Sequence, residues 1–149
     1  MGEQKNGDAD YRCTQSMTLP TTKQVVLPVL LIEDEPAVAE YVRTALERNG
    51  YAVVCSKSGA DGVRLLGLEE YLGVVSDMHT PGGLDGAQVH ERVAEHHPEL
   101  ASRFVFTTGD TANEETLATL RKTGAPWVEK PFLIQQLISV VERTMGKAA

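Results

Sequence analysis

The sequence predicts an α/β fold in which helices cover a parallel β-sheet. From Pro28 onward, short apolar runs alternate five times with segments of helical periodicity. The chain has 149 residues, 42% of them hydrophobic and 23% charged, so it is long and apolar enough for one domain with a buried core. Residues 1–27 are mostly polar and show no periodicity before Val25. We therefore expect a flexible polar leader, residues 1–27, and one folded domain, residues 28–149.

Five short apolar runs are the expected strands. Only 5% of the residues are aromatic, so aliphatic side chains must fill most of the core. The second run ends in Cys55, Ser56 and Lys57, an ambiguous end that suits an outer strand. The expected strands are Val29–Ile32, Tyr51–Cys55, Leu72–Val75, Phe104–Phe106 and Ala125–Val128.

Helical periodicity follows each apolar run. In the first helix, apolar residues recur at i, i+3, i+4, i+7 and i+8, Pro36 suits the first turn and Gly50 suits the C-terminal end. Ser58, with Asp61 three residues later, resembles a capping box at the start of the second helix. The apolar faces of the five helices are, in order, Val38, Tyr41, Val42, Ala45 and Leu46; Ala60, Val63 and Leu66; Val89 and Val93; Leu117 and Leu120; and Ile134, Leu137, Ile138, Val141 and Met145.

The charge of the chain limits its partners. With 14 Lys and Arg against 21 Asp and Glu, the formal net charge is −7, and no run of basic residues is present. Direct nucleic-acid binding is disfavoured, because phosphate contacts need a clustered basic surface.

The sequence shows no secretory signal and no apolar stretch of about 18 residues, and Cys13 and Cys55 resemble reduced thiols. We therefore expect a cytoplasmic protein without membrane insertion.

Polar side chains stand at the ends of four expected strands. Glu33 and Asp34 follow the first strand, Asp77 the third, Thr108 the fourth and Lys130 the fifth. The carboxyl ends of parallel strands gather at one edge of a sheet, so these side chains should meet there. Clustered carboxylates repel one another, which predicts a divalent cation among them, and Mg²⁺ fits because it prefers oxygen ligands and retains water. Such a centre suits phosphoryl transfer, with one carboxylate as nucleophile and with Lys130 and Thr108 facing the phosphoryl oxygens.

Each of these residues also has a purely structural interpretation. The acids just before Pro36 could cap a helix, and Thr108 could cap the segment that begins near Asp110. Lys130 alone could be an ordinary solvated lysine. Asp77 is harder to explain as a cap, because a loop rather than a helix follows it. The occurrence of all of them at the ends of four of the five expected strands favours catalysis.

Four motifs, LIEDE, VVSDMHTPGGLDG, FTTGD and VEKPF, occur in this order and together resemble the receiver domain of two-component response regulators, from about Pro28 to Met145. The resemblance implies a flavodoxin-like, doubly wound (βα)5 sandwich with strand order 2-1-3-4-5. It implies that Asp77 accepts a phosphoryl group from a phosphohistidine of a sensor histidine kinase or a histidine phosphotransfer protein. It also implies that Asp34, Asp77 and the backbone carbonyl of His79 bind Mg²⁺, with Glu33 acting mainly through water.

The same resemblance implies a switch. Thr108 would move toward the new phosphoryl group, and Trp127, three residues before Lys130, would change rotamer with it, unless Trp127 is plain core packing. The fourth helix, fifth strand and fifth helix would then present an altered surface to a downstream protein target, and the domain could also form a homodimer. The side chain of His79 would tune how water reaches the phosphoryl group, unless it is an ordinary surface residue. The domain would not be an enzyme beyond its own phosphorylation and slow dephosphorylation.

Three departures from the common receiver pattern stand out: Glu33 where Asp is more usual, Trp127 where Tyr or Phe is more usual, and a loop at residues 81–86 that is one residue longer. A hydrolase of the haloacid-dehalogenase type would need a second acid two residues after Asp77, where His79 stands. The remaining alternative is a pseudo-receiver, a binding scaffold that is not phosphorylated.

Two further expectations concern context and the other histidines. Few residues follow the fifth helix, so we expect either a free-standing receiver or a receiver cut from a longer hybrid kinase. We expect His90, His96 and His97 on helix surfaces, because their spacing does not suggest a metal site.

Overall fold

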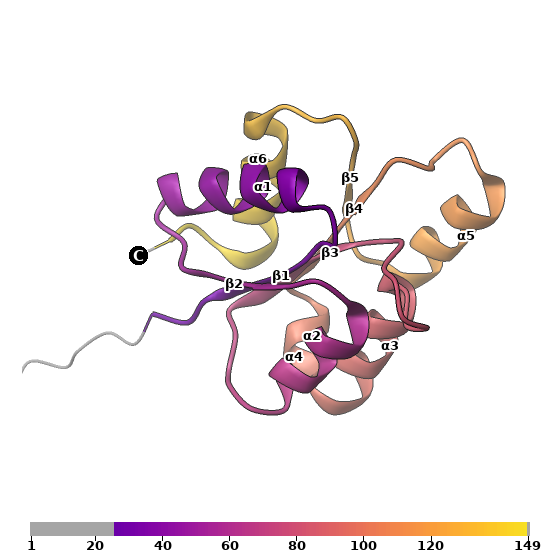
Figure 1. Ribbon diagram of the computed structural model, residues 1–149, viewed down its shortest axis with the longest axis horizontal. Helices are drawn as coiled ribbons and strands as arrows, with labels where there is room; N and C mark the ends of the chain where they lie inside the picture. Colours follow the sequence, from indigo (N-terminus) through magenta and orange to yellow (C-terminus); the bar gives the residue numbers. More distant parts are fainter. Residues whose placement is uncertain (1–25, 149) are drawn as a thin grey trace, which may run out of the picture.

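The computed structural model describes residues 26–148, which form a five-stranded parallel sheet with helices on both faces (Figure 1). The strand order is β2-β1-β3-β4-β5, so the predicted flavodoxin-like order 2-1-3-4-5 is confirmed. The elements in chain order are β1 (Val29–Ile32), α1 (Pro36–Arg48), β2 (Val53–Ser56), α2 (Gly59–Leu66), β3 (Gly73–Asp77), α3 (Gly86–His96), α4 (Pro98–Ala101), β4 (Phe104–Thr108), α5 (Glu114–Thr123), β5 (Trp127–Glu129) and α6 (Ile134–Met145).

The helices lie in two layers, one on each face of the sheet. α1 packs beside α6 on one face, while α2 to α5 cover the other (Figure 1). Successive strand residues point to opposite faces, so Val29 and Leu31 join the core under α1 and α6, whereas Leu30 and Ile32 join the core on the other face. All four side chains are at most 2% exposed, which explains why β1 is a continuous apolar run.

β2 is an edge strand, as its ambiguous end indicated, but it begins two residues later than predicted. Val53 is the first residue that pairs, opposite Val29. Tyr51 precedes the ladder, where its ring is buried in the core under α1 and α6 and its hydroxyl donates to the carbonyl of Gly146 at 2.6 Å. The apolar character of Tyr51 therefore reflects core packing and not strand pairing.

The predicted start of the fifth strand was also too early. α5 ends at Thr123, its C-cap residue Gly124 lies in the left-handed region with φ of 74°, and Ala125 and Pro126 carry the chain back to the sheet. The carbonyl of Pro126 accepts a hydrogen bond from Phe106 at 3.0 Å, but a proline has no N–H to donate in return. Regular pairing therefore begins only at Trp127.

Two local features differ from the sequence analysis. It did not predict α4, because a single turn shows no periodicity. At the start of α2, Ser58 accepts a hydrogen bond from the N–H of Asp61 at 3.0 Å, but the carboxylate of Asp61 bonds elsewhere, so the predicted capping box is only half formed. A complete capping box lies at the start of α3, between Asp85 and Gln88.

The prediction for His90 was wrong. Its ring is half-buried, with its centroid 4.9 Å from that of Phe104 and 5.9 Å from that of Phe106, because this face of α3 packs over β4. Burial lowers the pKa of His90, since the charged imidazolium is poorly solvated there. His96 is exposed, as expected. His97 is partly buried at the junction of α3 and α4, so the prediction of a helix-surface position was wrong for this residue as well.

The predicted leader lies outside the described residues except for Val26 and Leu27, which have no regular secondary structure. Cys13 lies in that part as well, whereas Cys55 is an exposed free thiol on β2. Within residues 26–148, no helix has both the length and the apolar character needed to cross a membrane.

Candidate functional site

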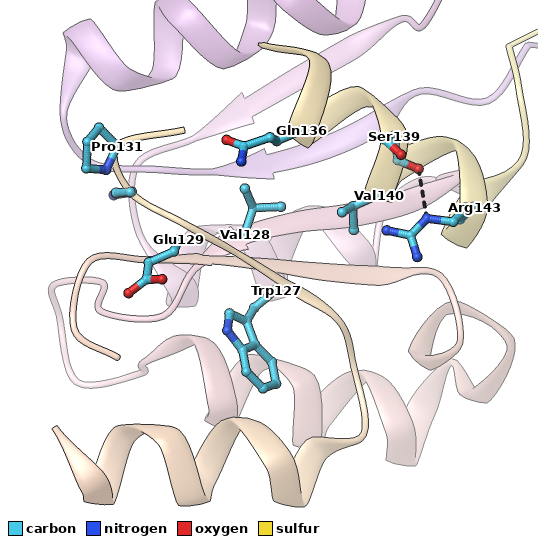
Figure 2. A pocket seen from close by; sticks show the side chains of 9 residues that line it. Trp127, Val128, Glu129, Pro131, Gln136, Ser139, Val140 and Arg143 are labelled. Carbon is cyan, nitrogen blue, oxygen red and sulfur yellow. Dashed lines mark hydrogen bonds between the residues drawn. The ribbon is translucent and has the colours of Figure 1, made fainter. Parts of the chain in front are cut away.

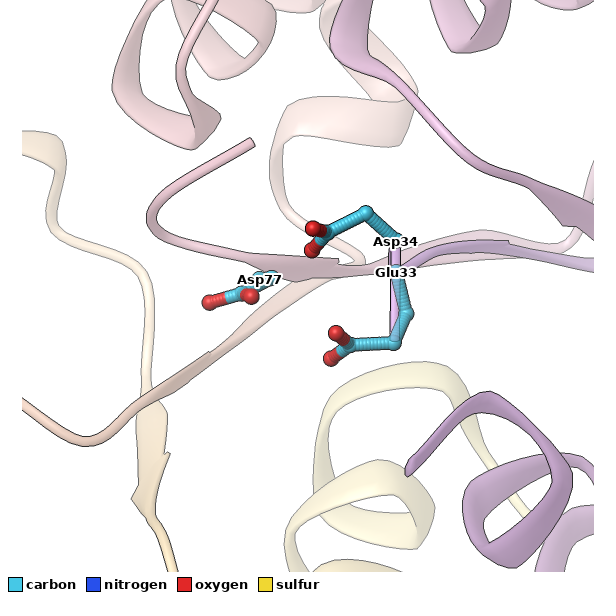
Figure 3. Close-up of side chains that lie close together, drawn as sticks. All are labelled: Glu33, Asp34 and Asp77. Atoms are coloured by element: carbon cyan, nitrogen blue, oxygen red, sulfur yellow. The ribbon is translucent and has the colours of Figure 1, made fainter. Parts of the chain in front are cut away.

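The ends of β1 and β3 bring three carboxylates together. The two strands are neighbours with Ile32 opposite Ser76, so the residues that follow lie side by side. Carboxylate oxygens of Glu33, Asp34 and Asp77 lie within 4.8 Å of one another. Figure 3 shows the three carboxylates turned toward the same space beyond the strand ends. The sequence analysis correctly placed these three residues at one point of the sheet edge.

The three acids differ in their environments. Glu33 and Asp77 are buried, 3% and 8% exposed, whereas Asp34 is open to solvent. Burial raises the pKa of Glu33, and the nearby charge of Asp77 raises it further. Glu33 also accepts the N–H of Glu35 at 3.2 Å. Glu35 occupies the N-cap position of α1 without a side-chain capping bond, so a helix-capping role for that side chain is excluded.

Lys130 reaches this cluster from the end of β5. Its Nζ donates to Oε1 of Glu33 at 3.1 Å and to Oδ2 of Asp77 at 3.2 Å. Burial of the Lys130 amine acts to lower its pKa, but the charges of Asp77 and Glu33 outweigh that effect and raise it. Lys130 is therefore a cation at neutral pH, and its partly buried contacts with Glu33 and Asp77 exclude the alternative that it is an ordinary solvated side chain.

The donor set fits a hard divalent cation. Three carboxylates against one ammonium leave an excess of negative charge when all are ionised, and a divalent ion would offset it. The exposure of Asp34 leaves room for the several waters that Mg²⁺ retains. Each of Glu33, Asp34 and Asp77 offers a carboxylate oxygen that could hold the ion. Glu33 and Asp77 share Lys130 as a hydrogen-bond donor.

Thr108 is the last residue of β4 and is fully buried. Its carbonyl accepts a hydrogen bond from the main-chain N–H of Lys130 at 2.7 Å, and its Oγ1 accepts one from the main-chain N–H of Asp110 at 3.2 Å. The alternative that Thr108 caps the segment near Asp110 is thus right about the bond, although α5 begins later and is capped by Asn113. That bond uses an oxygen lone pair, so the hydroxyl proton can still be donated to another acceptor.

His79 and Asp110 connect two loops beside the carboxylates. The imidazole of His79 is 57% exposed, and its Nε2 lies 3.5 Å from Oδ2 of Asp110, which also accepts the hydroxyl of Thr116 at 3.2 Å. The main-chain N–H of His79, and not its imidazole, donates a hydrogen bond to Oδ1 of Asp77 at 3.3 Å. Sequence analysis missed Asp110 as part of this region, although its place two residues after Thr108 was a usable signal.

Trp127 lies on the edge strand β5 opposite Phe106 and is half-buried. Figure 2 shows its indole on the α5 side of β5, while Gln136, Ser139 and Arg143 of α6 lie on the other side of the strand. These residues line a cavity of about 600 Å³ that also includes Lys130. The indole packs against the core under α2, α3 and α5, so core packing and a switching role are both compatible with its position.

Tyr41 is a second residue whose place near the site the sequence analysis missed. It was assigned only to the apolar face of the first helix, yet its hydroxyl donates to the carbonyl of Phe132 at 3.1 Å, two residues after Lys130. Nothing in the helical periodicity of α1 indicates this contact, because it depends on where the loop after β5 lies.

Comparison with known proteins shows what the chain resembles as a whole. The family model described as response regulator receiver domain matches residues 29–142. The chain is 34% identical over 126 residues to sensor kinase CckA of Brucella abortus, a match that covers 80% of this chain and 12% of that protein. It is 29% identical over 115 residues to response regulator protein FleR of Pseudomonas aeruginosa, covering 77% of this chain and 24% of that protein. The chain thus spans less than a quarter of either relative.

Solved structures show the same fold. The receiver domain of NtrX from Brucella abortus matches with a TM-score of 0.71 and 27% identity, covering 78% of this chain and 97% of that one. The chemotaxis protein CheY4 from Vibrio cholerae matches with a TM-score of 0.71 and 21% identity, covering 80% of this chain and 99% of that one. Since the family model spans residues 29–142, and the fold is that of the solved receivers, this chain belongs to the response regulator receiver domains of two-component signal transduction.

Proposed function

We propose that this receiver domain accepts a phosphoryl group on Asp77 from a phosphohistidine, in a reaction that requires Mg²⁺. The surroundings of Asp77 carry the proposal. Its carboxylate is buried at the end of β3, lies near those of Glu33 and Asp34, and has the Lys130 ammonium 3.2 Å from Oδ2. A carboxylate nucleophile, a cation site and a fixed positive charge are the parts that phosphoryl transfer needs.

The proposed step forms one bond and breaks one. A carboxylate oxygen of Asp77 attacks phosphorus, the P–N bond of the phosphohistidine breaks, and its electron pair returns to the imidazole nitrogen, which leaves an aspartyl phosphate. Lys130 stabilises negative charge on the phosphoryl oxygens, and Thr108 donates its hydroxyl proton to one of them. Mg²⁺, held by Asp34, Asp77 and the carbonyl of His79 with Glu33 acting through water, would offset the charge of the carboxylates and the phosphoryl group.

Phosphorylation would then act as a switch. The aspartyl phosphate carries about two negative charges where the carboxylate carried one, and it places three acceptor oxygens beside Lys130 and Thr108. Thr108 would move toward the phosphoryl group so that its hydroxyl donates to a phosphoryl oxygen, and Trp127 would shift with it. The readout surface would be α5, β5 and α6, the elements counted in the sequence as fourth helix, fifth strand and fifth helix.

The partners are proposed by class. CckA is named a sensor kinase and FleR a response regulator, and this chain is similar to part of each. A sensor histidine kinase or a histidine phosphotransfer protein is the proposed donor, and a downstream protein is the proposed target. Beyond its own phosphorylation and dephosphorylation, we assign the domain no enzymatic reaction.

Intact-mass analysis tests the proposal. The chain is incubated with Mg²⁺ and acetyl phosphate, beside Asp77→Asn and beside wild type with a chelator. We expect one phosphoryl adduct on wild type with Mg²⁺ and none in either control. The Asp77→Asn substitution keeps the size of the side chain, so a missing adduct reports the lost nucleophile and not a repacked core.

An adduct on Asp77→Asn equal to that on wild type would contradict the assignment of the site. Absence of an adduct on wild type, together with no binding of beryllofluoride in the presence of Mg²⁺, would favour the pseudo-receiver instead. Beryllofluoride mimics a phosphoryl group without needing a donor, so it separates a refused donor from an inactive site.

A further inference from the structure

Tyr41 connects α1 to the loop that carries Lys130. Its hydroxyl donates to the main-chain carbonyl of Phe132 at 3.1 Å, and the two ring centroids lie 5.9 Å apart. Phe132 itself is only 9% exposed and belongs to the core under α1 and α6. A residue 91 positions earlier in the chain thus holds this loop through both main chain and side chain.

The loop is short and is held on both sides of Lys130. β5 ends at Glu129, and α6 begins at Ile134. On the strand side, the N–H of Lys130 donates to the carbonyl of Thr108 at 2.7 Å. On the helix side, the first tertiary hydrogen bond is the one from Tyr41 to Phe132. The main chain from which the Lys130 side chain starts is therefore fixed between β4 and α1.

We propose that Tyr41 is a positioning residue for phosphoryl transfer. By holding Phe132 it keeps the Lys130 ammonium between Glu33 and Asp77, at 3.1 and 3.2 Å. The inference rests on the proposed function, because it presumes that Lys130 acts on the phosphoryl group bound to Asp77. A lysine side chain has several rotatable bonds, so the place of its amine depends on a fixed main-chain origin. Electrostatic stabilisation is effective only when the charge is already in place.

Tyr41 also lines a surface cavity. The experiment must therefore separate an effect on the binding of a protein donor from an effect on the position of Lys130. The side chain is 41% exposed and borders a cavity of about 520 Å³ together with Lys130, Pro131 and Phe132. A protein donor could contact the same ring, and a substitution would then act through docking. Acetyl phosphate has no surface that could dock there, so its rate of reaction reports the site alone.

The test compares two tyrosine hydroxyls. Tyr41→Phe removes only the hydrogen bond to Phe132 and keeps the ring. Tyr51→Phe is the matched control, because Tyr51 also donates to a main-chain carbonyl, that of Gly146 at 2.6 Å, at the C-terminal end of α6. We expect Tyr41→Phe to slow phosphorylation by acetyl phosphate about two- to tenfold, the effect of one hydrogen bond. Tyr51→Phe should leave that rate unchanged while lowering the unfolding midpoint.

Two further readouts separate positioning from a general structural role. Mg²⁺ affinity should be the same in wild type and Tyr41→Phe, because Lys130 is not a metal ligand, whereas beryllofluoride affinity should fall with the rate. Trp127 is the only tryptophan of the chain, so its fluorescence can follow both titrations. In a Lys130→Ala background, Tyr41→Phe should have no further effect on rate or beryllofluoride affinity, since there is no ammonium left to position.

Several outcomes overturn the inference. If wild type is phosphorylated on Asp77 and Tyr41→Phe reacts equally fast with acetyl phosphate, Tyr41 does not position Lys130, and the proposed function stands. An equal loss in the Lys130→Ala background, or a parallel loss of Mg²⁺ affinity, assigns Tyr41 a structural role only. Wild type that takes no phosphoryl group and binds no beryllofluoride contradicts the proposed function, and the positioning role with it.

Discussion

At the scale of single residues, Lys130 stabilises a group of carboxylates that would otherwise repel one another. Its ammonium is shared between Glu33 and Asp77, and both of those side chains are buried. The sequence predicted that Lys130 and the acids share one sheet edge, because strand ends of a parallel sheet converge there. It could not predict the shared hydrogen bonds, which depend on the rotamers of three side chains.

Lys130→Ala should destabilise the metal-free protein by about 1–3 kcal/mol, because two buried acids lose a charged hydrogen-bond donor. Mg²⁺ should bind to the variant and reduce the difference from wild type, since the ion replaces the missing positive charge. Urea unfolding with and without Mg²⁺ measures both effects. Lys122→Ala, at an exposed position on α5, is the control that removes a lysine without a site contact. Equal stability of Lys130→Ala and wild type without Mg²⁺ would contradict the account.

The contact between His79 and Asp110 shows where residue-level prediction ends. Each residue follows a different strand, and both could be placed near the site from the sequence. Their 3.5 Å approach depends on the course of two loops, one of them with Gly82 and Gly83 at positive φ. Periodicity and capping signals do not fix such a course, so the pair could not be predicted.

At the scale of elements, α3 connects the site to the core on the α2 to α5 face. It begins nine residues after Asp77 and packs His90 against Phe104 of β4. The sequence showed Val89 and Val93 as the apolar stripe of this helix, and both are fully buried. It did not show His90 as part of the same packing, because an imidazole is compatible with either a surface or a core position.

His90 should make stability depend on pH. Burial lowers its pKa from the ordinary value of 6.5, so the unfolded chain binds a proton that the folded chain does not. The contribution of neutral His90 to the free energy of unfolding is fully present above pH 6.5, and it is lost as the pH falls through the lower pKa of the folded state. Denaturant unfolding at several pH values should show the decrease, and His90→Gln should make the curve flatter. His96→Gln, at an exposed position, should leave the curve unchanged; equal curves for both variants would contradict this assignment.

Gly86, the first residue of α3, should not tolerate a side chain. A Cβ at this position would lie 2.5 Å from the carbonyl oxygen of Asp77 and 2.9 Å from Cα of Met78, both main-chain atoms. Gly86→Ala should therefore lower the free energy of unfolding by about 1–3 kcal/mol and slow phosphorylation, because Asp77 must shift. Gly67→Ala is the control, since its Cβ would meet ordinary contacts at 3.5 Å. Thermal unfolding and acetyl phosphate reaction together measure the two effects.

At the scale of the whole molecule, the fold was almost entirely predictable. Five aliphatic runs separated by amphipathic helices have few arrangements other than a doubly wound parallel sheet. In that fold both faces of the sheet are buried, and alternate residues of β1 accordingly belong to the two cores on opposite faces. The strand order came from the family resemblance, since periodicity alone does not order strands. Only β1 has the predicted bounds. β2 and β5 begin later than predicted because Tyr51 and Ala125 are buried outside the ladder, and β3 and β4 extend two residues further, to Asp77 and Thr108.

Mg²⁺ should stabilise the whole domain by mass action. A ligand that binds only the folded state adds about 2.7 kcal/mol to the free energy of unfolding at a concentration of 100 times its Kd. Asp34→Asn should nearly abolish this gain. Because Asp34 is exposed, the same variant should change the metal-free stability by no more than about 0.5 kcal/mol. Stabilisation of Asp34→Asn by Mg²⁺ to the same extent as wild type would remove Asp34 from the proposed ligands.

The position of Cys55 on β2 and of Trp127 on β5 places a thiol and an indole on opposite edges of the sheet. Four strand spacings of about 4.8 Å separate the two edges, a span of about 19 Å. With Cys13 replaced by Ser, an acceptor dye on Cys55 and the single tryptophan form an energy-transfer pair within the domain itself. Such a pair would report whether the β5 edge moves relative to the rest of the sheet during signalling, without any label near the carboxylates.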